Sequence, residues 1–161
     1  RHIETLRERS NAEPPQVRLI RLPQQTVYRR VITSATVAER SVLLRSVALE
    51  GMRLYGTDVS HRMYLVESPL DRPDELSFCA AVPPESRGEN VAVLPMTQAL
   101  SIYHHGAYEE LPAVAQRLLS AARERRLTPK GTLRRIYLEG PPQHKEARKF
   151  ITQVALPIED A

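Results

Sequence analysis

The sequence contains a single cysteine, no tryptophan and no apolar segment long enough to cross a membrane. Cys79 has no second cysteine with which to form an internal disulfide, so a disulfide-stabilised scaffold is excluded and a reducing compartment is favoured. The long uncharged segment at residues 91–108 contains a proline, a glutamine, a serine and two histidines, and it is too polar to span a bilayer. We therefore expect a cytoplasmic protein with no membrane partner.

The motifs of common enzyme and cofactor sites are also missing. The sequence has no glycine-rich phosphate loop, no dinucleotide-binding G-x-G-x-x-G pattern and no G-x-S-x-G nucleophile turn. Cys79 lies in an apolar run, which is typical of a buried structural thiol and not of an activated nucleophile. His104 and His105 are adjacent, so on a strand their rings point to opposite faces and do not share a metal ion. The sequence predicts no catalytic residue, no cofactor and no metal.

The charge of the chain is mildly positive and does not by itself indicate nucleic-acid binding. The 161 residues include 23 basic and 19 acidic ones, a net charge of +4, with 42% hydrophobic residues. This is the composition of a globular chain with one domain or two small ones. Basic residues gather at 117–135, but that segment has no interleaved aromatic residues and no helix-turn-helix pattern. A solvated, salt-bridging surface is the better interpretation of this cluster.

Thirteen prolines divide the chain into short elements. Runs rich in β-branched and aromatic residues predict strands at 16–23, 26–33, 61–68, 75–82, 91–105, 133–142 and 147–158. Apolar residues at three- and four-residue steps predict helices at 37–55 and 109–126. Pro23 predicts an edge strand or a bulge, Ser34 is placed to cap the first helix, and Gly56 is placed to end it.

Three pairs of residues recur in the same order at nearly constant spacing. The matched pairs are Leu22–Pro23 with Leu94–Pro95 (72 residues apart), Tyr64–Leu65 with Tyr137–Leu138 (73 apart) and Val82–Pro83 with Leu156–Pro157 (74 apart). The predicted order strand, helix, strand, strand recurs with them, which indicates an internal duplication. We assign repeat one to residues 16–84 and repeat two to residues 89–158.

An aromatic ring and a carboxylate are predicted to lie side by side in the second half. Strand alternation puts Tyr137 and Glu139 on one face and Ile136 and Leu138 on the other. Tyr64 takes the position of Tyr137 in the first half. A pocket between the halves would combine apolar walls with a few polar groups, and would attract a hydrophobic cation through cation–π and Coulomb interactions. The alternative is that Glu139 is an exposed carboxylate at the end of the strand.

Three short motifs lie in the second half of the chain. They are a G-x-Y at a helix start (YHHGAYEELPAVAQRLL, 103–119), a Tyr-Leu strand that ends in a proline turn (IYLEGPP, 136–142) and a final strand close to T-E-V-x-x-P-I (ITQVALPI, 151–158). With these motifs, residues 16–158 resemble the GyrI-like (gyrase-inhibitor-like) effector-binding domain. The resemblance implies an α+β fold, a tandem βαββ repeat in which two helices back a curved antiparallel sheet with pseudo-twofold symmetry. It also implies a ligand pocket along the pseudo-twofold axis.

Domains of this kind form the carboxyl-terminal half of many MerR-type and some AraC-type transcription regulators, where they bind lipophilic and often cationic drugs. The resemblance therefore implies a ligand-sensing domain that is not an enzyme. Residues 1–15 resemble the end of the dimerisation helix that follows a MerR-type DNA-binding domain, with a Pro-rich connection. We expect DNA to be contacted only through an N-terminal domain outside this sequence, and the full-length protein to be a homodimer.

The resemblance and the strand faces together select the candidate ligand-binding residues. Tyr108 completes the G-x-Y motif, and Tyr137 with Glu139 matches the pocket-lining strand of the family. Gln153 stands where the family commonly has Glu, which weakens the case for a strongly cationic ligand. The candidate set is Tyr28, Tyr64, Phe78, Tyr103, Tyr108, Tyr137, Glu139 and Gln153. Two alternatives stay open: a small-molecule hydrolase that uses Glu139 as general base, and a stand-alone protein that binds another protein, as gyrase inhibitors do.

Overall fold

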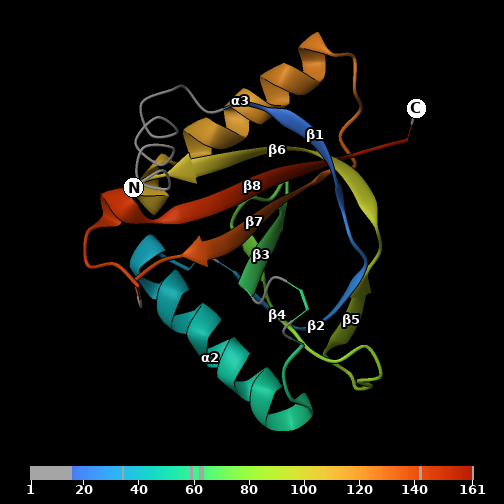
Figure 1. Ribbon diagram of the computed structural model, residues 1–161, viewed down its shortest axis with the longest axis vertical. Coiled ribbons are helices and arrows are strands. Elements are labelled where there is room, and N and C mark those ends of the chain that lie inside the picture. Colours follow the sequence, from blue (N-terminus) through green and yellow to red (C-terminus); the bar gives the residue numbers. More distant parts are fainter. Residues whose placement is uncertain (1–15, 34, 59, 62–63, 142, 161) are drawn as a thin grey trace, which may run out of the picture.

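The computed structural model describes residues 16–33, 35–58, 60–61, 64–141 and 143–160, which form one sheet and two long helices (Figure 1). The strands are β1 (Arg18–Leu22), β2 (Gln25–Thr33), β3 (Tyr64–Pro69), β4 (Glu75–Ala81), β5 (Val91–Leu94), β6 (Thr97–His105), β7 (Thr132–Glu139) and β8 (Ile151–Ile158). The helices are α2 (Val37–Tyr55) and α3 (Leu111–Glu124), with short 3₁₀ turns η1 (Tyr108–Glu110) and η2 (Ala147–Lys149). The prediction for residues 1–15 lies outside the described residues.

The eight strands form one antiparallel sheet in the order β1-β6-β8-β7-β3-β4-β2-β5. The strands of the first half, β1 to β4, correspond to β5 to β8 of the second half. If each strand is replaced by its counterpart, the strand order is the same when read from the opposite edge of the sheet. β3 and β7 pair at the centre of the sheet. The predicted α+β class, with a tandem βαββ repeat and pseudo-twofold symmetry, is therefore confirmed, while the repeat boundaries stay a prediction.

The first strand of each half pairs with the other half. β1 is an edge strand bonded to β6, and β5 is the opposite edge strand, bonded to β2. Pro23 lies between β1 and β2, and Pro95 lies between β5 and β6, so each proline breaks the ladder where the chain changes partner. This confirms the edge strand predicted at Pro23, and it divides the predicted strand 91–105 into two.

The sheet curls into a half-barrel. β5 and β6 stand at the eighth and second positions of the sheet, yet only residues 95–96 connect them. In a flat sheet these strands would lie roughly 29 Å apart, at about 4.8 Å per strand, and so short a link reaches about 11 Å. The curl creates an inner face whose core takes one side chain from each strand: Leu22, Val27, Leu65, Cys79, Leu94, Ala99, Ile136 and Ala155.

α2 and α3 both cover the other face of the sheet, each over its own half (Figure 1). The α3 core includes Leu100, Ile102, Leu111, Val114, Leu118, Ala122, Val154 and Leu156. The α2 core includes Tyr28, Leu44, Val47, Val66, Leu76 and Phe78. The helix-covered face therefore holds two cores that meet where β3 pairs with β7.

The ends of α2 follow standard capping chemistry, with one correction. The cap is Thr36 and not the predicted Ser34, which lies outside the described residues. Thr36 Oγ1 accepts the backbone N–H of Glu39 at 3.2 Å, and the Glu39 carboxylate accepts the backbone N–H of Thr36 at 2.9 Å. This reciprocal pair is a capping box, which selects Thr36 because Glu39 stands three residues after it. Gly56 ends the helix with a φ of 89°, as predicted.

Thr36→Ala should lower the free energy of unfolding by about 1 kcal/mol, because the backbone N–H of Glu39 loses its acceptor. Thr36→Ser keeps the hydroxyl and serves as the matched control. Urea denaturation followed by circular dichroism measures both variants. Equal stability of the alanine and serine variants would contradict the capping role of this hydroxyl.

Candidate functional site

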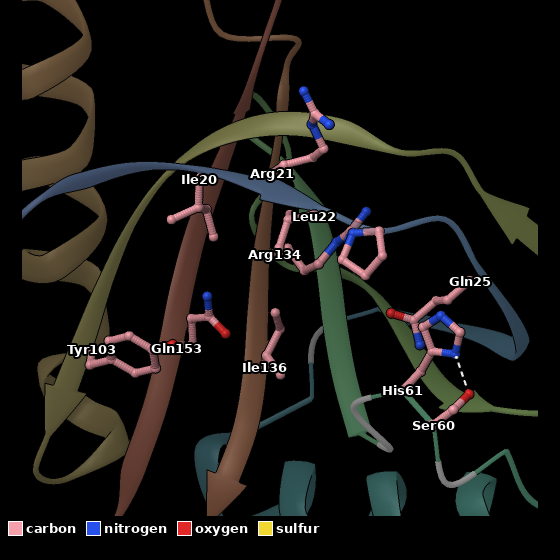
Figure 2. A pocket seen from close by; sticks show the side chains of 11 residues that line it. Ile20, Arg21, Leu22, Gln25, Ser60, His61, Tyr103, Arg134, Ile136 and Gln153 are labelled. Atoms are coloured by element: carbon pink, nitrogen blue, oxygen red, sulfur yellow. Dashed lines mark hydrogen bonds between the residues drawn. The ribbon is translucent and has the colours of Figure 1, made fainter.

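The inner face of the half-barrel holds a cavity of about 520 Å³ (Figure 2). Two candidate residues, Tyr103 on β6 and Gln153 on β8, lie on its wall, and they are direct partners across the sheet. The Gln153 amide donates a hydrogen bond to the Ser101 hydroxyl at 3.1 Å. The structure thus brings these two predicted residues together, although the amide of Gln153 already has a partner.

An ion pair lies on the same inner face. Arg134 Nε lies 2.8 Å from Glu67 Oε2, and the two side chains are only 5% and 15% exposed. Arg134 and Ile136 both line the cavity, whereas Tyr137 packs against the α2 core, so the predicted separation of Ile136 from Tyr137 is confirmed. A register shift between Tyr137 and Glu139 interrupts the alternation that was predicted to place these two side chains on one face. The cavity, however, lies on the Ile136 side of the strand. The carboxylate that pairs with Arg134 on this face is Glu67, which was not among the candidates predicted from the sequence.

Ser60 and His61 line the edge of the cavity (Figure 2), and together with Asp58, which His61 contacts, they supply the residue types of a nucleophilic triad. His61 Nδ1 lies 2.9 Å from Asp58 Oδ2 and 3.1 Å from Ser60 Oγ. A triad needs the serine on one ring nitrogen and the carboxylate on the other. Because both groups share Nδ1 here, this geometry does not let His61 activate Ser60, and Asp58 instead holds the turn by accepting the backbone N–H of Ser60.

A second group of candidate residues gathers on the helix-covered face. The Tyr108 ring meets the Tyr137 ring edge-to-face, with centroids 5.3 Å apart, and lies 4.9 Å from the centroid of Phe150. We call these three residues the aromatic cluster. Tyr108 packs against the α3 core and Tyr137 against the α2 core, so their contact joins the two halves. Burial raises the pKa of Tyr108 to about 12 and also raises the pKa of Tyr137, so both phenols are protonated at neutral pH.

Two glycines allow Tyr108 to reach this position. Gly106 has a φ of 151°, which side chains rarely permit, and its N–H donates to the Phe150 carbonyl at 2.9 Å. A Cβ on Gly140 would lie 2.5 Å from the Tyr108 hydroxyl oxygen, so Gly140 leaves the space that this hydroxyl occupies. The G-x-Y motif and the turn after Glu139 therefore meet at one point of the structure.

Among the described residues, two buried polar atoms on this face have no hydrogen-bond partner: Nε of Arg135 and the hydroxyl of Thr152. Thr152 is the direct partner of Tyr137 across β7 and β8, and Arg135 lies two residues before Tyr137. Cross-strand partners and alternate residues project to the same face, so all three side chains lie together. Burial and then the charge of Arg135 lower the pKa of Arg40 in α2, so a second positive charge acts on Arg135. Sequence analysis counted Arg135 as part of a surface cluster and selected neither Thr152 nor Arg40.

Glu139 lies at the end of β7, after a register shift that begins at Tyr137. Its Oε1 lies 2.5 Å from His144 Nε2, and both side chains are partly exposed. Glu139 is therefore a paired carboxylate at the rim of the second half. No sequence signal connected it with His144, because His144 lies in the turn without regular structure between β7 and η2.

Three further candidates lie elsewhere. Tyr28 and Phe78 are fully buried in the α2 core, and the Tyr28 hydroxyl donates to the Glu50 carboxylate. Tyr64 is partly exposed at the start of β3. This placement supports ordinary core packing for Tyr28 and Phe78, while a ligand-binding role for Tyr64 stays a prediction.

Other kinds of site find little support in the part of the chain that the structure describes. There, no group of three His, Cys, Asp or Glu side chains is close enough to hold a metal ion. No helix in these ranges is both long and apolar enough to cross a membrane. Cys79 is buried in the inner core, and this burial raises its pKa to about 12. The thiolate is the reactive form of cysteine, so the predicted structural thiol is confirmed.

Comparison with solved structures identifies proteins that share this fold. The C-terminal domain of EcmrR superposes with a TM-score of 0.80 at 19% identity, over 92% of this chain and 100% of that one. The chain has the fold of the EcmrR C-terminal domain. The fold implied by the sequence resemblance is thereby confirmed. EcmrR in its complex with DNA matches with the same TM-score of 0.80 at 18% identity, over 99% of this chain and 63% of the EcmrR chain.

More distant structures share the fold. SAV2435 bound to tetraphenylphosphonium has a TM-score of 0.59 at 16% identity, over 89% of this chain and 94% of that one. A hydrolase from Listeria innocua has a TM-score of 0.56 at 11% identity, over 98% of both chains. No protein-family model matches the sequence, and the comparison with curated proteins finds no match. Because one fold hosts many functions, these likenesses establish architecture, and function must be argued from the site.

Proposed function

We propose that this chain is the effector-binding domain of a transcription regulator, and that it binds a lipophilic aromatic molecule at the aromatic cluster without catalysing a reaction. The observation that carries the proposal is the contact of Tyr108 with Tyr137 at the junction of the two cores, next to buried polar atoms without partners. Folded proteins satisfy nearly all their buried polar groups, so exceptions call for an explanation such as a missing ligand. Aromatic walls with a few polar groups are the usual lining of a small-molecule site.

A ligand at this junction would contact both halves at once. The α2 core and the α3 core are separate clusters, and the aromatic cluster lies where they meet. Binding would favour the arrangement of the two halves for which the ligand has the higher affinity. The size of this shift is set by the difference between the ligand's affinities for the alternative arrangements. A DNA-binding domain outside this sequence, a homodimeric full-length protein and a cytoplasmic location belong to the same proposal.

The comparisons support the regulatory context and the class of ligand. EcmrR, whose C-terminal domain has this fold, is bound to DNA in its complex. SAV2435 is bound to tetraphenylphosphonium, a lipophilic molecule with four aromatic rings. Both observations concern those proteins, and they support the proposal that this fold serves ligand-dependent regulation here.

A matched pair of tyrosine variants tests where the ligand binds. Aromatic compounds of both charges and neutral ones are screened by thermal shift, and the hits are measured by calorimetry. Tyr108→Leu should weaken binding of a hit by about fivefold, since an aromatic contact is worth about 1 kcal/mol. Tyr103→Leu makes the same change in the inner cavity and should leave the affinity within about twofold.

The reverse pattern, with Tyr103→Leu as the weaker binder, would assign the ligand to the inner cavity and overturn the aromatic cluster as the site. The absence of any stabilising compound would contradict ligand sensing itself.

One observation favours hydrolysis as a second candidate function. Glu139 and His144 form a close carboxylate–imidazole pair at 2.5 Å, a pairing that can serve as a general base. The Listeria innocua hydrolase shares the fold. Turnover of an electrophilic small molecule that is lost in Glu139→Gln, with ligand affinity retained, would establish this alternative.

A further inference from the structure

We infer that the effector is an aromatic carboxylate, with its ring against the aromatic cluster and its charged group on Arg135 and Thr152. The inference rests on the proposed function and names the ligand class of that same site. It reverses the charge expected from the resemblance, which implies a lipophilic and often cationic ligand.

Arg135 lies at the junction of the two halves. Its direct partner on β3 is Val66, which belongs to the α2 core, and its direct partner on β8 is Val154, which belongs to the α3 core. Side chains of such partners share a face, so Arg135 projects between the two cores. It is only 8% exposed, and its Nε–H has no acceptor in the part of the chain that the structure describes. A buried donor beside the aromatic cluster is thus left for another molecule.

The charge around Arg135 is positive. Guanidinium groups are always protonated in proteins, and the charge of Arg135, after burial, lowers the pKa of Arg40, so the positive charges of these two residues act on each other. Within the described ranges, neither arginine forms an ion pair with a carboxylate. Glu67 is taken by Arg134 on the opposite face. An anion would neutralise this charge, whereas a cation would be repelled by it.

Thr152 supplies the second polar group. It is fully buried and lies directly across the sheet from Tyr137, and its hydroxyl has no partner among the described side chains and backbone. A hydroxyl and a guanidinium N–H on the same side of a ring are both donors that a carboxylate accepts, and hydrogen bonds to a charged acceptor are the strong ones. Two of the candidate residues that could attract a cation are engaged elsewhere, because Glu139 pairs with His144 and Gln153 bonds Ser101.

Three compounds with the same ring and different charges distinguish the effect of ligand charge from the effect of ring packing. They are 2-naphthoate (anionic), 2-naphthamide (neutral) and 2-naphthamidine (cationic). Calorimetry with the whole chain should show 2-naphthoate binding at least about tenfold more tightly than the amide, with the amidine weakest. Arg135→Gln should weaken 2-naphthoate by about 10- to 100-fold and leave the amide unchanged. Arg123→Gln on the exposed surface of α3 makes the same change in net charge and should alter neither.

A second variant covers the case in which Arg135→Gln fails to fold. Thr152→Val preserves shape and removes the hydroxyl, and it should weaken 2-naphthoate by about tenfold while the amide binds as before. Melting temperatures of ligand-free variants separate a binding role from a structural one. Arg135→Met should melt at a temperature no lower than the original chain, because it removes an unpaired buried charge.

The outcomes distinguish the two proposals. If the amide or amidine binds as tightly as 2-naphthoate, and Tyr108→Leu weakens it, the carboxylate inference is overturned and the aromatic site stands. If none of the three binds at millimolar concentration, both proposals are overturned. A lower melting temperature for Arg135→Met, with 2-naphthoate affinity intact in Thr152→Val, would make Arg135 a structural residue and overturn the inference.

Discussion

Glu67→Gln is expected to lower the free energy of unfolding by about 3–5 kcal/mol, because it leaves the Arg134 guanidinium buried without a counter-charge. The two side chains form a 2.8 Å ion pair in which neither is more than 15% exposed. β3 and β7 carry them as direct partners at the centre of the sheet, so the halves cannot shift to admit water without breaking the ladder. Urea denaturation gives the free energy directly.

The control for this prediction removes both charges. Glu67→Gln combined with Arg134→Gln should recover most of the loss, since the penalty comes from the unpaired ion and not from the missing bridge. A loss below about 1 kcal/mol in the single variant would show that the pair behaves as a surface salt bridge. It would also show that water reaches Arg134 from the inner cavity.

Phe78→Ala should cost about 3–5 kcal/mol of stability while leaving ligand affinity unchanged. Phe78 is 0% exposed and packs in the α2 core, so its removal loses buried apolar surface and leaves a cavity. The expected result separates a core aromatic from a binding one among residues that sequence analysis grouped together. Chemical denaturation and calorimetry with a bound compound measure the two quantities.

Tyr64→Ala is the matched control for this comparison, because Tyr64 is an aromatic candidate that is partly exposed. It should cost less than about 1 kcal/mol. If Phe78→Ala weakened ligand binding as strongly as Tyr108→Leu, the ligand would reach into the α2 core, and the boundaries of the site would have to be extended.

The fold was largely predictable because its signals are local and repeated. Periodicity located both helices, and the recurring Leu-Pro pairs marked where each half changes sheet partner, since proline interrupts a ladder wherever it lies. The end of α2 was predictable from Gly56 alone. Its start was not, because Ser34 and Thr36 are equally good caps in isolation and the choice depends on Glu39.

The candidate site was predictable only in part, because alternation separates the two faces of a strand without saying what covers each. Both faces of β7 are buried here, one by the curl of the sheet and one by the helices. Arg134 and Arg135 are neighbours of the same type, yet one pairs with Glu67 and the other has an unpartnered Nε. That difference arises from cross-strand partners far away in sequence. Tyr108 and Tyr137, by contrast, were both selected because each lies in a motif, and their rings are in contact. Their role in binding a ligand stays a prediction.

The pairing of β1 with β6 and of β5 with β2 means that neither half holds a complete set of its own strands. The first strand of each half completes the sheet of the other half, as in a strand-swapped dimer, but here the two repeats belong to one chain. Separating the two halves would break the β1–β6 and β5–β2 pairings at both edges of the sheet at the same time. The halves should therefore unfold together, and a ligand at the aromatic cluster can only rotate or bend them about the central β3–β7 pair.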